Sequence, residues 1–196
     1  MNEVILDLET QRAFVESGKY DPKKLGVSYV GICQRTMDSE ERGSGELSGF
    51  FKNQLGGLWP ILEQADRIIG FNIMGFDLPV LSEYYLGDTA SFPTLDILEE
   101  VKKIVGHRVS LDAIAKETLG IEKSGTGLDA LLYYEQSRFE ELASYCLSDV
   151  RITRDVYDFG RKHQQLKFKD KWNRVVTVPV DFSFRGEAKI QMSLGV

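Results

Sequence analysis

The sequence predicts an α/β fold, a mixed β-sheet flanked by helices with a β-hairpin near the C-terminus. Three observations support this prediction. Short apolar runs and helical patterns follow one another in the order strand, strand, strand, helix, strand, helix. A long helical pattern comes next, and two strand-like runs follow it. With 196 residues, 42% of them hydrophobic, the chain is long enough to bury the core of one domain.

The first half of the chain is expected to supply most of the sheet. The apolar run 4–6 predicts a buried strand, which a polar turn region at 10–24 separates from the alternating apolar run 25–33, a second strand. A polar, glycine-containing loop at 37–46 leads to a short third strand. The remaining elements of this half are a helix at 54–65, a central strand at 67–71 and a helix at 78–86.

The second half is mainly helical before its hairpin. Segment 93–97 starts a fifth strand or a strand-to-helix turn, and the loop 124–127 lacks the Gly-x-x-x-x-Gly-Lys-Ser/Thr pattern of a nucleotide-binding loop. Helical patterns cover 97–105, 110–119 and 136–162, and the runs 166–169 and 175–180 around 170–174 predict the hairpin. We expect a domain at 1–162 and a basic hairpin extension at 163–196 packed on it.

Two acidic residues, Asp7 and Glu9, directly follow the first apolar run. A strand alternates its side chains, so both carboxylates point to one face while Leu8 is turned away. They stand at the carboxyl end of the strand, where open α/β sheets bind ligands. For this segment alone, a pair of acids that closes a strand in solvent is the alternative.

Two further segments carry acidic residues in a matching context. Asp77 follows the strand-like segment 67–71 and precedes a helical pattern with Pro79 in its first turn, so a helix N-cap is its alternative role. Tyr145 and Asp149 are four residues apart in a helical pattern and therefore neighbours on one face. The alternative for that pair is a core tyrosine and an exposed aspartate.

If the fold gathers these acids, metal binding follows. Mg²⁺ takes hard oxygen ligands, and four carboxylates packed close together would otherwise repel one another. We expect two Mg²⁺ or Mn²⁺ ions, with Asp7 bridging them, and a phosphodiester-cleaving reaction. The expected ligands are Asp7, Glu9, Asp77 and Asp149, and the Tyr145 hydroxyl would hold the attacking water.

The three segments resemble the ExoI, ExoII and ExoIII motifs of the DEDD 3′–5′ exonucleases, which have the ribonuclease H-like fold. Tyr145 makes the chain similar to the DEDDy branch, because the other branch has a histidine where this chain has Ser144. Asn72-x-x-x-Phe76-Asp77 resembles the middle motif of the proofreading domain of family B DNA polymerases. Predicted ribonuclease H-like exonuclease families of bacteria and phages are similar as well. The resemblance spans about residues 3–160.

Carried over motif by motif, the resemblance implies catalytic and metal-binding roles for the four acids and a water-positioning role for Tyr145. It also implies a lysine-bearing loop that follows a helix and touches the nucleic acid. The substrate-binding residues that it implies are Leu8, Thr10, Asn72, Phe76 and Lys123.

The net charge of −6 by itself counts against a nucleic-acid partner. The distribution of charge along the chain weakens this objection. Residues 151–196 carry ten Lys and Arg against five Asp and Glu. Basic residues there are interleaved with Phe168 and Trp172, as is typical of single-strand binding, and an ordinary solvated hairpin is an equal alternative. We expect weak, salt-sensitive binding.

We therefore expect an exonuclease that releases nucleoside monophosphates from the 3′ ends of single-stranded nucleic acid, DNA in preference to RNA. A non-catalytic nucleic-acid- or protein-binding module and an internally cutting ribonuclease H-like nuclease are the alternatives. Any polymerase or helicase partner would be a separate chain. With neither a charged leader nor a membrane-length apolar run, we expect a cytoplasmic or nucleoid-associated protein with buried free thiols at Cys33 and Cys146.

Overall fold

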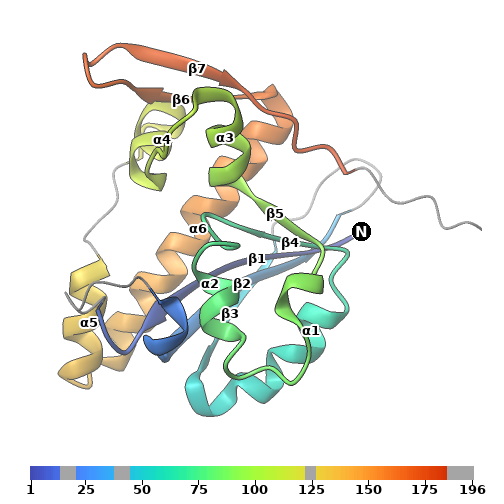
Figure 1. Ribbon diagram of the computed structural model, residues 1–196, viewed down its shortest axis with the longest axis vertical. Coiled ribbons are helices and arrows are strands. Elements are labelled where there is room, and N and C mark those ends of the chain that lie inside the picture. Colours follow the sequence, from blue (N-terminus) through green and yellow to red (C-terminus); the bar gives the residue numbers. More distant parts are fainter. Residues whose placement is uncertain (14–20, 38–44, 122–126, 185–196) are drawn as a thin grey trace, which may run out of the picture.

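The computed structural model describes residues 1–13, 21–37, 45–121 and 127–184. Its centre is a five-stranded mixed sheet with helices on both faces, which confirms the predicted fold class (Figure 1). The strand order is β3-β2-β1-β4-β5. No helix in these ranges is both long and apolar enough to cross a membrane. The strands are β1 (Asn2–Thr10), β2 (Val27–Thr36), β3 (Glu46–Phe51), β4 (Arg67–Gly70) and β5 (Thr94–Asp96).

The direction of the strands brings several chain segments to one edge of the sheet. β2 pairs antiparallel with both β1 and β3, whereas β4 runs parallel to β1 and to β5. The carboxyl ends of β1, β4 and β5 therefore meet at the same edge. The loops that leave these three strands are placed to build a site there.

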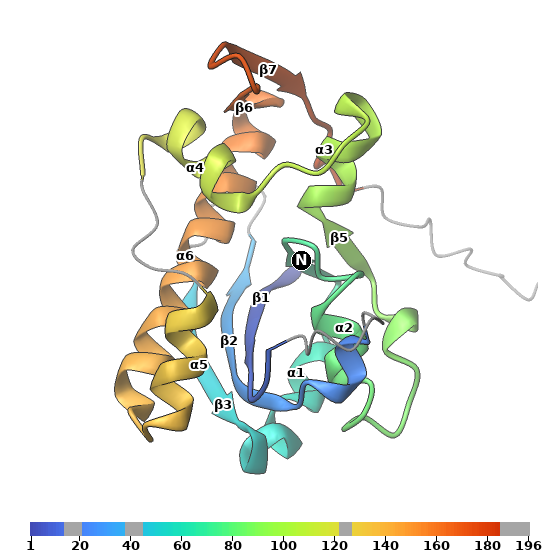
Figure 2. The same ribbon diagram turned by 60° about the vertical axis from the view of Figure 1, so that its left-hand side comes forward.

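Side-chain alternation along β1 divides the core into two layers. Ile5 packs with Val150 and Val156 of the long helix α6 (Phe139–His163). The neighbouring side chains Leu6 and Leu8 pack on the other face, against α1 (Trp59–Glu63) and α2 (Asp77–Leu81). Figure 2 shows α5 (Gly127–Glu135) beside α6, and the remaining helices are α3 (Ile97–Val105) and α4 (Leu111–Leu119).

Two predicted helical segments differ from the observed ones, and one observed helix was not predicted. The expected helix at 54–65 is a 3-10 helix, Lys52–Gly57, followed by the short α1, because two glycines weaken the segment and Pro60 fits only a helix start. The helix expected at 78–86 ends at Leu81, where the Ser82 hydroxyl donates to the Pro79 carbonyl at 2.8 Å. α5 was not predicted. Further 3-10 helices lie at Pro22–Lys24 and Thr89–Ser91.

The predicted C-terminal hairpin is confirmed as β6 (Gln165–Lys169) paired antiparallel with β7 (Val175–Pro179). Leu166 and Val178 bury their side chains in the same cluster as Val156. The division into parts at 1–162 and 163–196 stays a prediction. Trp172 at the hairpin turn is 64% exposed, with Lys171 and Arg174 over its ring, and its contact with a substrate also stays a prediction.

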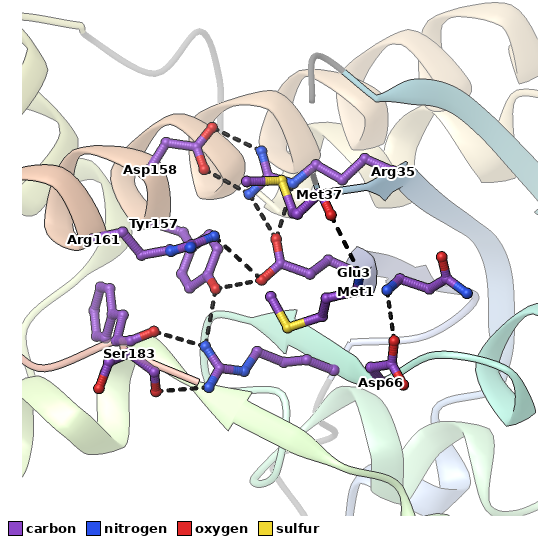
Figure 3. A network of polar contacts seen from close by, with 12 residues as sticks. Met1, Glu3, Arg35, Met37, Asp66, Tyr157, Asp158, Arg161 and Ser183 are labelled. Carbon is purple, nitrogen blue, oxygen red and sulfur yellow. Dashed lines mark hydrogen bonds and ion pairs between the residues drawn. The ribbon is translucent and has the colours of Figure 1, made fainter. Parts of the chain in front are cut away.

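A buried ionic network holds the beginning of β1 against α6 (Figure 3). The fully buried Glu3 carboxylate accepts hydrogen bonds from the Arg35 guanidinium at 3.0 Å and from the Tyr157 hydroxyl at 2.6 Å. Arg35 also pairs with Asp158, and Arg67 donates from β4 to the Tyr157 hydroxyl and to the Phe182 carbonyl. The network therefore ties the sheet, α6 and the segment after β7 together.

Candidate active site

The carboxyl end of β1 places two acids on the face that α6 covers. Asp7 lies opposite Gly31 of β2 and Glu9 lies opposite Tyr29, so both side chains project to the same side, as predicted. Both are half-buried, whereas Leu8 between them is buried in the core on the other face. Because both acids are half-buried, the alternative, in which they are only solvent-exposed acids at the end of a strand, does not describe them.

Asp77 reaches the same place from the start of α2. Its side chain is 3% exposed, and its Oδ1 accepts a hydrogen bond from the backbone N–H of Leu8 at 3.1 Å. The N-cap of α2 is Phe76. The alternative in which Asp77 serves only as a helix cap is therefore wrong: its carboxylate is hydrogen-bonded to β1.

A second buried aspartate, Asp96, fixes the turn that leads to Asp77. Its two oxygens accept hydrogen bonds from the backbone N–H groups of Asn72 and Met74 at 2.9 and 3.0 Å, and it also caps α3. Asn72 has a φ of 63°, a left-handed conformation that asparagine tolerates better than most residues. Sequence reasoning missed this role of Asp96, although an aspartate between a strand and a helix is a recognisable cap signal.

The long helix α6 contributes Tyr145 and Asp149, one turn apart on its inner face. They are 8% and 4% exposed. An exposed Asp149, the alternative for this segment, is therefore wrong. A carboxylate so deeply buried on a helix face needs a functional or electrostatic reason to be there.

The four predicted acids and Tyr145 line one cavity of about 410 Å³, whereas Asp96 is not part of its lining. It is lined by Asp7 and Glu9 from β1, Asp77 from α2, and Tyr145 and Asp149 from α6. The predicted residues Leu8, Thr10 and Phe76 line it too, whereas Asn72 is not part of the lining and lies in the turn that precedes Asp77. Lys123 lies outside the described residues.

Helix α5 forms a wall of this cavity that sequence reasoning missed. Gly127, Leu128 and Leu131 line it from the start of this helix. The leucines recur at helical spacing, which was a usable signal for the helix. Because the segment also carries two tyrosines, its apolar residues do not form one clear stripe. This wall places apolar surface opposite the acids.

The electrostatics of the cavity are dominated by like charge. Burial and the neighbouring Asp7 carboxylate raise the pKa of Asp77 well above its ordinary value, and Asp96 adds to the shift. Cys146, fully buried, donates from Sγ to the Asp7 carbonyl at 3.4 Å and lies 3.9 Å from Asp7 Oδ2. Burial first, and then Asp7, Glu9 and Asp149, raise the pKa of the Cys146 thiol, so it stays protonated.

These residues fit a divalent cation site. Ligand atoms of Asp7, Glu9 and Cys146 lie within 4.8 Å of one another, and Asp77 and Asp149 line the same cavity. The four carboxylates supply hard oxygen donors, which suit Mg²⁺ and Mn²⁺. The protonated thiol of Cys146 is a poor ligand for such ions and packs beneath the acids. Both cysteines are buried and free, as predicted.

The fold and the cavity together define a class: a mixed α/β sheet with carboxylates from β1, α2 and α6 gathered at its carboxyl edge. Residues 15–159 match the family described as RNase_H superfamily, so the chain belongs to the RNase H superfamily. The matched region includes Asp77, Tyr145 and Asp149 and begins after β1. The family assignment confirms the predicted ribonuclease H-like resemblance and supports a nuclease.

Solved structures of similar fold include a family B DNA polymerase from the archaeon Pyrobaculum calidifontis, at 19% identity and a TM-score of 0.59. E. coli exonuclease I in complex with a dT13 oligonucleotide is similar at 14% identity and a TM-score of 0.52. The matches cover 82% and 83% of this chain but only 24% of the polymerase and 41% of the exonuclease. At such identities the likeness shows the fold alone. The search of curated proteins found no match.

Proposed function

We propose that this protein is a two-metal-dependent 3′–5′ exonuclease that releases nucleoside monophosphates from single-stranded nucleic acid, with DNA favoured over RNA. The observation that carries the proposal is the single cavity lined by Asp7, Glu9, Asp77, Tyr145 and Asp149. The membership of the RNase H superfamily supports the same chemistry. A polymerase or helicase partner and a cytoplasmic or nucleoid location stay predictions from the sequence.

In this proposal Asp7, Glu9, Asp77 and Asp149 hold two Mg²⁺ or Mn²⁺ ions. Bound there, such ions make a water molecule more acidic and stabilise charge on the departing 3′ oxygen. The chain's own groups supply position: Tyr145 orients the attacking water through its hydroxyl, and the Leu8 N–H fixes Asp77. Leu128 and Leu131 cover the cavity with apolar surface, which excludes competing water from the terminal nucleotide.

The test is digestion of 5′-labelled single-stranded DNA and RNA of one sequence with Mg²⁺, with Mn²⁺ and with EDTA. We expect a ladder that shortens from the 3′ end, requires the metal and advances faster on DNA. Asp7→Ala should remove the activity, whereas Asp112→Ala, at an exposed aspartate of α4, should retain it.

Cleavage by Asp7→Ala at the wild-type rate would contradict the proposal. Internal fragments instead of a ladder would favour an internally cutting nuclease of the same fold. Intact oligonucleotides in every metal, with a retained gel shift, would favour a binding module.

A further inference from the structure

A second cavity adjoins the acidic one, where β2 begins and β3 ends. Its volume is about 610 Å³, against about 410 Å³ for the acidic cavity. Much of its lining is aromatic, and we call it the aromatic groove after Phe51, Tyr84, Tyr134 and Phe139. Nothing in the proposed chemistry uses this groove.

The linings of the two cavities follow one another along α5. Leu128 and Leu131 line the acidic cavity, and Tyr134, three residues further along, lines the aromatic groove. Residues three apart share a helix face, so this face forms one wall over about 9 Å. At the end of β1, Thr10 lines the acidic cavity and the next residue, Gln11, lines the groove. A strand that leaves the acidic cavity along this wall therefore enters the groove.

The rings of the groove offer surface for stacking. Phe139 packs edge-on against Phe51 and Tyr134, with ring centroids 5.7 and 6.4 Å apart. Although it has these two neighbours, Phe139 keeps 44% of its surface exposed. Exposed aromatic faces beside a nuclease cavity suit nucleobases, because every base has a π-face.

Two polar residues of the groove point to a nucleotide as its occupant. Lys52 is exposed, and its ammonium lies 5.6 Å from the centre of the Tyr84 ring, where it can meet a phosphate. Ser28 is 2% exposed, and its hydroxyl has no hydrogen-bond partner within the described part of the chain. Buried hydroxyls are normally paired. A hydroxyl can donate or accept, so it suits the polar edge of any base.

We propose that the aromatic groove is a base-binding subsite for the nucleotides on the 5′ side of the terminal residue. It holds them by stacking and by a phosphate contact to Lys52, without strong sequence preference. This inference rests on the proposed exonuclease function and adds to it the path of the single strand. It predicts that substrates long enough to reach the groove bind more tightly than dinucleotides.

The test measures binding and turnover separately for Phe139→Ala. Binding of fluorescein-labelled dodecathymidylate is measured by fluorescence anisotropy in the presence of Mg²⁺. All proteins in this assay also carry Asp149→Asn, because this substitution blocks the proposed turnover. We expect Phe139→Ala to weaken this binding about tenfold and Phe139→Trp to restore it. The matched control is Phe184→Ala, which removes a phenylalanine that is 45% exposed beside Arg67. It should leave the affinity unchanged.

The second measurement is the rate of cleavage, for which the variants keep Asp149. Phe139→Ala should raise KM about tenfold for the dodecamer, leave kcat within twofold, and leave the dinucleotide reaction unchanged. Equal dodecamer affinity in Phe139→Ala and the control would overturn the subsite, even if cleavage follows the proposed function. Weaker binding in Phe139→Ala, in a protein that cleaves nothing, would retain the subsite and reject the exonuclease. An equal loss for the dinucleotide and the dodecamer would indicate a structural role and also overturn the subsite.

Discussion

Two buried aspartates near the candidate active site differ in what their oxygens meet. Asp96 accepts hydrogen bonds from several backbone N–H groups, which spread its charge over a turn and a helix start. Asp77 accepts a hydrogen bond from the Leu8 N–H, and its burial, together with the neighbouring Asp7 carboxylate, raises its pKa well above the ordinary value. Asp96 therefore has a structural explanation within the chain, whereas by our proposal a bound cation compensates the charge of Asp77.

The raised pKa of Asp77 makes metal-free stability depend on pH. The folded state keeps this proton to a higher pH than the unfolded state, in which an aspartate has a pKa of about 3.9. The free energy of unfolding should therefore fall as pH rises from the unfolded pKa through the raised one. Asp77→Asn keeps the acceptor for the Leu8 N–H and removes the charge, so this fall should shrink and the variant should be more stable at neutral pH. Urea unfolding in EDTA across this range measures both.

The control for the comparison of wild type with Asp77→Asn is the same unfolding experiment with Mg²⁺ added. Adding Mg²⁺ should stabilise the wild type at neutral pH and stabilise Asp77→Asn less, because the variant has lost a ligand. Identical pH dependence in the two metal-free proteins would contradict the electrostatic account of Asp77.

The proposed role of Tyr145, to orient the attacking water, depends on its hydroxyl oxygen alone. Tyr145→Phe keeps the buried ring and removes the hydroxyl from the cavity wall. We expect kcat to fall by about 10²-fold while the affinity for Mn²⁺ stays the same, since the hydroxyl orients water and does not hold the ion. Tyr133→Phe on α5 is the control, and stopped-flow digestion of labelled DNA gives the rates. Unchanged kcat would assign the water to another group.

At the scale of elements, the distance between α6 and the sheet sets the geometry of the site. Gly31 of β2 lies opposite Asp7 in the register, directly under α6. A Cβ at this glycine would lie 3.0 Å from both Cys146 Sγ and Val150 Cγ2. The glycine therefore lets the helix approach closely enough to bring Asp149 to the β1 acids.

Gly31→Ala should separate the acids without removing any of them. A shift of the helix approaching 1 Å is expected to lower kcat by up to about 10²-fold, with a smaller effect on stability. Gly56→Ala, where a Cβ would meet nothing within 4 Å, is the matched control. Steady-state digestion and thermal unfolding of both variants separate the two effects. If Gly31→Ala kept full activity, the close approach would have no catalytic meaning.

The sequence predicted the sheet and the acids better than it predicted what surrounds them. Strand alternation placed Asp7 and Glu9, and helical spacing placed Tyr145 and Asp149, because both patterns are local. Cys146 beneath Asp7 depends on a contact across 139 residues, which no local pattern carries. The prediction of one helix at 54–65 was wrong. It followed the apolar spacing, whereas in the molecule the two glycines and Pro60 divide the segment into a 3-10 helix and a short α-helix.

At the scale of the whole molecule, β1 carries carboxylates on the same face at both ends, with opposite compensation. At the carboxyl end, burial and the Asp7 carboxylate raise the pKa of Asp77. Glu3, in contrast, is surrounded by Arg35 and Arg161 and by the Tyr157 hydroxyl (Figure 3). The protein supplies the countercharge at one end, and by our proposal metal ions supply it at the other. Removing Glu3 would take this carboxylate away from both guanidinium groups, and Arg35 would keep its ion pair with Asp158.

Glu3→Gln tests this compensation. Breaking a buried ion pair from one side typically costs about 3–5 kcal/mol, so urea unfolding should show a loss of that size. Glu63→Gln, at an exposed glutamate bonded to the Tyr85 hydroxyl, should cost less than about 0.5 kcal/mol. At a temperature where the variant stays folded, its kcat should remain within twofold of wild type. A loss as small as that of the control would show that the network adds no net stability.

The length of α6 connects these two ends of the molecule. Its 25 residues extend over roughly 37 Å. Tyr145 and Asp149 lie in its first half, and Tyr157 and Asp158, which join the Glu3 network, lie in its second. Backbone amides in one packed helix tend to exchange with solvent as one cooperative unit. Opening that releases the segment after β7 would thus also expose Tyr145 and Asp149 in the candidate active site, and any ligand bound there would slow exchange at the opposite end.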